Sequence, residues 1–205
     1  MQPRKEYFSC PCPCHYWQSL LDLTNTEKRV KSSTSTCGTD NQSKTGEDFI
    51  IKPENDSKDY RVVTLPNKLK AIVISDPEAD KAAAALSILA GSMHDPETIP
   101  GIAHFCEHMV FLGTKKYPQE NFLGDYLASN AGDYNAFTQR DMTNYYFDVA
   151  PSSLEQALDR FAQLFIAPLF LEQSAEREVF AINSEHEKNI PNDGERRTLV
   201  DSTLS

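Results

Sequence analysis

The segment PGIAHFCEHMVFLG, residues 100–113, is bounded like a complete helix. Pro100 suits the first turn because it has no amide hydrogen to leave unpaired, and Gly113 favours the left-handed conformation that ends many helices. Inside these limits His104 and His108 are four residues apart, and a rise of roughly 1.5 Å per residue places both imidazoles on one helix face. We therefore predict a helix that presents two histidines to one metal ion.

The residue types in this segment are those of a zinc site. Neutral imidazole is a good zinc ligand, and a catalytic zinc ion takes three protein ligands and keeps a position for water. Glu107 borders the same face, and a carboxylate there can accept a proton from water and pass it to a leaving amine. The HxxEH pattern predicts one zinc ion per chain, held by His104 and His108, with Glu107 as the catalytic base. Two surface histidines that pair with Glu107 on an ordinary helix are the competing interpretation.

A third ligand is expected from a downstream helix, residues 173–188, which contains four glutamates. Glu178 and Glu185 are seven residues apart, or two helical turns, and so lie on the same face. One of them can bind the metal while the other supports the site from behind. Spacing does not choose between the two, and solvation is the better explanation for Glu176 and Glu187.

The remaining pattern predicts an α+β fold. Segments with alternating apolar residues indicate strands, and segments with apolar residues every three or four positions indicate helices. The periodicity of residues 82–89 fits either a strand or a helix, and a further strand of the sheet is the simpler interpretation. We expect a mostly antiparallel sheet with helices packed on one face, one of which carries HxxEH. The predicted strands are 61–65, 69–74, 82–89, 133–138 and 143–149, and the predicted helices are 101–112, 118–129, 152–165 and 173–188.

Composition divides the chain into a polar leader and one domain. Residues 1–57 contain the run SSTST and no sustained periodicity, so we predict a disordered leader followed by a domain at 58–205. The net charge of -10, without clustered Lys and Arg, argues against nucleic-acid binding. No apolar run is long enough to span a membrane, and the amino terminus lacks the apolar core of a secretory signal. The predicted location is cytoplasmic.

Several ordered blocks of the sequence resemble one protein family. Together they are similar to the amino-terminal catalytic domain of the pitrilysin-type (inverzincin) zinc metallopeptidases, over about residues 60–193. The blocks are GIAHFCEHMVFLGTKKYP at 101–118, NAFT at 135–138, TNYYFDV at 143–149, ALDRFAQ at 157–163 and SEHEKN at 184–189.

The resemblance implies a role for each candidate residue of the metal site. It makes His104, His108 and Glu185 the zinc ligands. It makes Glu107 the catalytic base and Glu178 the supporting acidic residue. The implied activity is that of a zinc metalloendopeptidase, which hydrolyses peptide bonds by Glu-assisted attack of water on the substrate carbonyl.

The resemblance also implies a substrate site and partners. Asn135, Ala136 and Phe137 would lie on a sheet edge that pairs with an extended peptide. Family members are much longer and have a second homologous half, and residues 193–205 depart from their pattern, so we expect a truncated carboxyl end. The expected partners are peptide substrates and a second half or a further copy of the chain. A non-catalytic peptide-binding or regulatory module that needs another chain for turnover is the alternative function.

Overall fold

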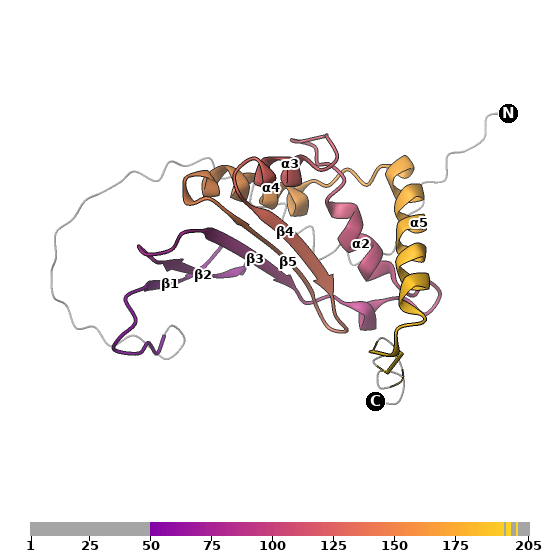
Figure 1. Ribbon diagram of the computed structural model, residues 1–205, viewed down its shortest axis with the longest axis horizontal. Helices are drawn as coiled ribbons and strands as arrows, with labels where there is room; N and C mark the ends of the chain where they lie inside the picture. The colour runs from indigo at the N-terminus through magenta and orange to yellow at the C-terminus, as the bar shows by residue number, and fades with distance from the viewer. Residues whose placement is uncertain (1–49, 195, 198–199, 201–205) are drawn as a thin grey trace. The chain divides into compact units, whose positions relative to one another are not determined.

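The computed structural model describes residues 50–194, 196, 197 and 200 (Figure 1). The disordered leader predicted for residues 1–57 lies outside this part, except for its last eight residues, which contain a turn at Glu54 and Asn55. The chain divides into two compact units, residues 1–79 and 80–205, and each is described by itself. Among the described residues, no helix is both long and apolar enough to cross a membrane.

The described part of the first unit is a β-hairpin. Strands β1 (Asp59–Thr64) and β2 (Lys70–Ser75) pair antiparallel. The connecting turn is closed by a hydrogen bond from the Leu65 amide to the Leu69 carbonyl at 2.9 Å, and Lys68 adopts a φ of 69° within it. The hairpin predicted from the alternating apolar residues is therefore confirmed.

The second unit is built on a three-stranded antiparallel sheet in the order β3-β5-β4. The central strand β5 (Thr143–Val149) pairs with β3 (Ala82–Ile88) on one side and with β4 (Asp133–Thr138) on the other. Of the predicted segment 82–89, residues 82–88 form a strand, and this strand pairs with β5. Its side chains alternate between half-buried and exposed, as a strand of period two requires.

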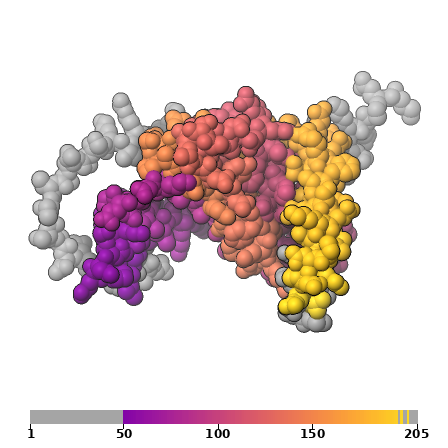
Figure 2. Space-filling model, in the orientation of Figure 1, coloured from indigo at the N-terminus to yellow at the C-terminus, as the bar shows by residue number. Residues whose placement is uncertain are grey.

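Helices cover one face of this sheet, which confirms the predicted α+β class. Helices α2, α3 and α4 contact the strands, and α5 packs against α2, so that α2 lies between the sheet and α5 (Figure 1). In the space-filling view α5 forms a ridge along one side of the unit (Figure 2). The helices are α2 (Ile102–Val110), α3 (Phe122–Ala128), α4 (Leu154–Ile166) and α5 (Glu172–Asn189), with single 3-10 turns η2 (Ser92–His94) and η3 (Pro151–Ser153).

The hydrophobic core forms where β5 meets α4. The ring centroids of Tyr145 and Phe165 are 5.0 Å apart, and those of Phe147 and Phe161 are 5.1 Å apart. All four side chains are buried, and offset or edge-on aromatic pairs at such distances add to the stabilisation from apolar burial. Burial also raises the pKa of Tyr145, which keeps its phenol neutral. This core supports the sheet against which α2 packs.

An upstream aspartate caps α2, because the N-cap residue Gly101 has no side chain and adopts a φ of 89°. Asp95 Oδ2 accepts a hydrogen bond from the Gly101 amide at 2.7 Å, and Asp95 Oδ1 accepts one from the Ala103 amide at 2.9 Å. A carboxylate at this position also interacts favourably with the positive end of the helix dipole. Asp95 thus holds the first turn of the helix that carries the histidines.

Replacing Asp95 with alanine should therefore lower the free energy of unfolding by about 0.5–2 kcal/mol, as the loss of a helix cap does. Urea denaturation followed by circular dichroism measures the change. Asp95→Asn keeps one acceptor oxygen and should lose less stability than Asp95→Ala. An alanine variant as stable as the wild type would show that α2 does not depend on this cap.

Candidate metal centre

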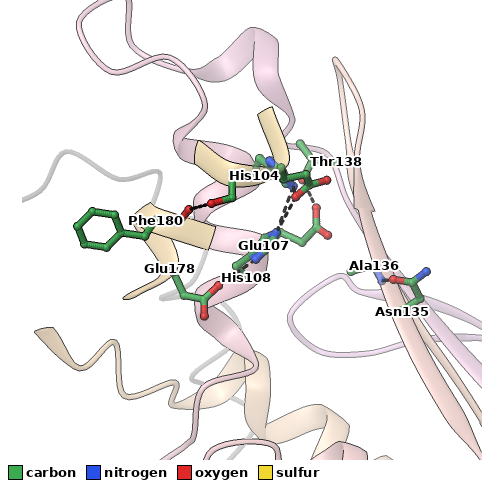
Figure 3. Close-up of polar contacts among 10 residues, drawn as sticks. His104, Glu107, His108, Asn135, Ala136, Thr138, Glu178 and Phe180 are labelled. Atoms are coloured by element: carbon green, nitrogen blue, oxygen red, sulfur yellow. Dashed lines mark hydrogen bonds and ion pairs between the residues drawn. The ribbon is translucent and has the colours of Figure 1, made fainter. Parts of the chain in front are cut away.

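Helix α2 presents the site residues in two directions. Successive residues of a helix are rotated by roughly 100°, so Glu107 points to a different side from His108. Glu107 is 7% exposed and accepts a hydrogen bond from Thr138 of β4. His108 instead contacts Glu178 of α5. Figure 3 shows the Glu107 side chain directed toward Thr138 and the His108 ring beside Glu178.

Three donor atoms from α2 and α5 converge as a metal site requires. The Nε2 atoms of His104 and His108 are 3.2 Å apart, and Glu185 Oε2 lies 3.7 Å from the first and 3.8 Å from the second. Tetrahedral zinc with ligands at about 2.0–2.1 Å holds its donors roughly 3.3 Å apart. The three atoms are thus within about half an ångström of that spacing. The side chains remain 28–46% exposed, which leaves access from solvent.

Glu178 contacts the back of one candidate ligand. Its Oε2 atom is 3.0 Å from His108 Nδ1. A neutral imidazole carries one hydrogen, so an Nδ1–H that donates to Glu178 leaves the lone pair of Nε2 facing His104 and Glu185. Carboxylates behind metal-binding histidines act in this way: they hold the tautomer and orient the ring. Glu178 and Glu185 therefore occupy different places around His108, although their spacing alone did not separate them.

Thr138 is the functional candidate that sequence reasoning missed. Its hydroxyl donates to Glu107 Oε2 across 31 positions of the chain. An ionised carboxylate has no hydrogen to give, so Thr138 is the donor of this bond. The neighbouring hydroxyl of Thr143 donates instead to the Ala90 carbonyl at 2.7 Å. The sequence signal was weak: period two places Thr138 on the half-buried side of β4, but no local pattern connects it with α2.

The predicted substrate residues lie apart from the three donor atoms, on a sheet edge. Asn135, Ala136 and Phe137 belong to β4, which has β5 as its one partner among the described strands. The Ala136 amide donates to Asn135 Oδ1 at 2.9 Å (Figure 3), and Phe137 is 40% exposed. The same strand ends in Thr138, so it connects this edge directly to Glu107.

The electrostatics of the centre favour a cation. Glu178 and Glu185 lie beside two imidazoles that are uncharged in their ligand form, and the same helix α2 carries the carboxylate of Glu107. Buried or partly buried carboxylates need hydrogen bonds or positive charge to offset their lost hydration. His104, His108 and Glu185 form a group of His and Glu side chains whose ligand atoms all lie within 4.8 Å of one another. Nitrogen and oxygen donors of this kind suit zinc.

Comparison with known proteins agrees with this geometry. The pattern of the family described as insulinase (peptidase family M16) matches residues 70–205, which is most of the chain. The chain belongs to the insulinase family. The resemblance to pitrilysin-type peptidases found in the sequence is thereby confirmed. The family match begins later than that resemblance and continues through the last residues, where the resemblance ended.

Individual members of the insulinase family are similar over the same region. The insulin-degrading enzyme of Mus musculus is 54% identical over 150 residues, which are 73% of this chain and 15% of that protein. The insulin-degrading enzyme of Drosophila melanogaster is 57% identical over 144 residues, 70% of this chain and 14% of that protein. The crystal structure of pitrilysin has a TM-score of 0.69 at 37% identity and covers 72% of this chain and 16% of the pitrilysin chain. The chain thus spans about one seventh of the length of these relatives.

Proposed function

We propose that this chain is the zinc-binding catalytic part of a metalloendopeptidase that hydrolyses the peptide bonds of small peptides. One observation carries the proposal: the donor atoms of His104, His108 and Glu185 converge, and helix α2, which supplies both histidines, also carries the buried carboxylate of Glu107. Membership of a peptidase family supports the same conclusion. Peptides are the proposed substrates, and the cytoplasmic location and a second half or further copy stay predictions from the sequence.

The protein groups divide the chemistry between binding and proton transfer. His104, His108 and Glu185 would hold zinc, which when bound supplies a Lewis acid that polarises a peptide carbonyl and makes water more acidic. Glu107 accepts a proton from the attacking water and delivers it to the leaving amine. Thr138 holds one oxygen of Glu107 and leaves the other to face the reacting atoms. Glu178 keeps His108 in the tautomer that can bind metal.

The edge of β4 would bind the substrate as an added strand. An extended peptide gains main-chain hydrogen bonds at a free edge, while pockets for its side chains determine which peptide sequences bind. The Ala136 amide, which donates to Asn135 Oδ1, is a donor for such a peptide once that side chain moves aside. Because Thr138 ends the same strand, a peptide bound along Asn135, Ala136 and Phe137 would run toward Glu107.

The same edge favours a second candidate function, peptide binding without turnover. Strand addition needs only the main chain of β4 and not the metal centre. Zinc content and cleavage of a quenched fluorescent peptide, measured on the purified 205-residue chain, separate the two functions. About one zinc per chain, with cleavage that a chelator stops and added zinc restores, supports the peptidase. Zinc with peptide binding but without cleavage supports the second candidate, and a chain that binds no zinc contradicts the metal centre.

Replacing Thr138 with valine should slow peptide hydrolysis about tenfold, because a hydrogen bond to a charged group contributes about 1.5 kcal/mol or more. Valine has the shape of threonine and suits a strand, so the fold should be kept. The effect should fall on kcat, with KM and zinc content unchanged. Thr138→Ser restores the hydroxyl and should recover most of the rate. Equal loss in the serine and valine variants would contradict the role of the hydrogen bond.

A further inference from the structure

Helix α5 brings two carboxylates to the metal centre although it buries little of its own surface. Among its described side chains only Ser174 is buried, at 1% exposure, whereas Phe180 is 74% exposed. Glu178 and Glu185 nevertheless lie within reach of the α2 histidines. A helix without a broad apolar contact needs specific contacts to hold its rotation and its position along its axis.

Such contacts exist at the amino-terminal end of α5. The Ser174 hydroxyl donates to Glu120 Oε1 at 2.7 Å, and the Arg177 guanidinium pairs with the same oxygen. Arg177 Nη2 also donates to Ser174 Oγ at 3.3 Å, so the three side chains form one polar cluster, here called the α5 clasp. The hydrogen bond from Ser174, and then that from Arg177, lowers the pKa of Glu120 and keeps the acceptor ionised.

The buried member of the clasp, Ser174, lies on the same stripe of α5 as the candidate metal-site carboxylates. Ser174 is four residues before Glu178 and eleven before Glu185, which corresponds to one and three helical turns. A rotation of α5 by one residue, roughly 100°, would turn both carboxylates away from α2. Holding Ser174 therefore holds the direction of Glu178 and Glu185.

The segment that carries Glu120 is itself joined to both helices of the site. It follows α2 directly, and its buried residue Thr114 forms an isolated β-bridge with Pro168, just before α5. The Lys115 amide donates to the Ala167 carbonyl at 2.9 Å in the same place. This short, hydrogen-bonded segment thus fixes the position of α5 relative to the end of α2.

We propose that Glu120, Ser174 and Arg177 are positioning residues that set the rotation and axial position of α5 and so deliver Glu178 and Glu185 to the histidines. The inference rests on the proposed metal centre. None of the three side chains contacts the donor atoms, so their effect acts through the helix.

Zinc affinity of the full 205-residue chain, measured by competition with a chromogenic chelator, tests the clasp without any need for turnover. Glu120→Ala and Ser174→Ala should each weaken zinc binding by about 10- to 100-fold, the range for residues that orient metal ligands. Glu176→Gln, an exposed change on the same helix, is the matched control and should leave the affinity unchanged.

Amide hydrogen exchange in the metal-free chain gives an independent measurement. Loss of the clasp should speed exchange in α5 and leave β5 protected, because the sheet does not depend on it. Faster exchange in α5 and β5 alike would indicate general destabilisation and overturn the inference. A wild type that binds zinc, with clasp variants of equal affinity, would overturn the inference alone. A wild type that binds no zinc would overturn the proposed function, and the inference with it.

Discussion

Replacing Glu107 with glutamine should lower peptide hydrolysis by about 100- to 10,000-fold, the usual contribution of a general base. Glutamine has nearly the same shape, and its amide oxygen can still accept the hydrogen bond from Thr138. The fold and the metal ligands should therefore be kept while the proton acceptor is lost. Cleavage of a quenched peptide and zinc content, measured on the same preparation, give the two required values.

The control for Glu107 is another glutamate outside the centre. Glu187 is exposed on α5 and accepts a hydrogen bond from Asn183 in its own helix. Glu187→Gln removes one negative charge without touching the donor atoms and should keep the full rate. If Glu107→Gln hydrolysed peptides as fast as the wild type, the carboxylate would not be the base and the proposed mechanism would be wrong.

Replacing His108 with alanine should remove both zinc and hydrolysis. The change leaves two of three protein donors, whereas catalytic zinc sites use three. It also leaves Glu178 without its 3.0 Å partner, so two carboxylates would face each other across the vacated space. Metal analysis after dialysis should show a fall from about one zinc per chain to a small fraction of that.

A second histidine serves as the comparison for His108. His186 follows Glu185 in α5 but is exposed and is not among the grouped donors. His186→Ala should keep zinc and activity. If His108→Ala kept stoichiometric zinc while His186→Ala lost it, the ion would sit elsewhere and the assignment of the donors would fail.

Local sequence was enough for most of the secondary structure. The hairpin, β4, β5 and helix α2 followed from alternation, from apolar residues at helical spacing and from the proline and glycine that bound α2. The pairing of the 82–88 strand did not follow, because alternation defines a strand and says nothing of its neighbour in the sheet. That neighbour, β5, lies some sixty residues further along the chain.

The same division applies to the metal centre. The sequence alone determined that His104, Glu107 and His108 share one helix, because their relation depends on helix geometry alone. It left Glu178 and Glu185 equivalent, since residues two turns apart face the same way. Their different places beside His108, like the bond from Thr138 to Glu107, come only from tertiary structure. The rotation of α5 and the approach of β4 to α2 depend on contacts between residues far apart in the chain, and no local spacing contains them.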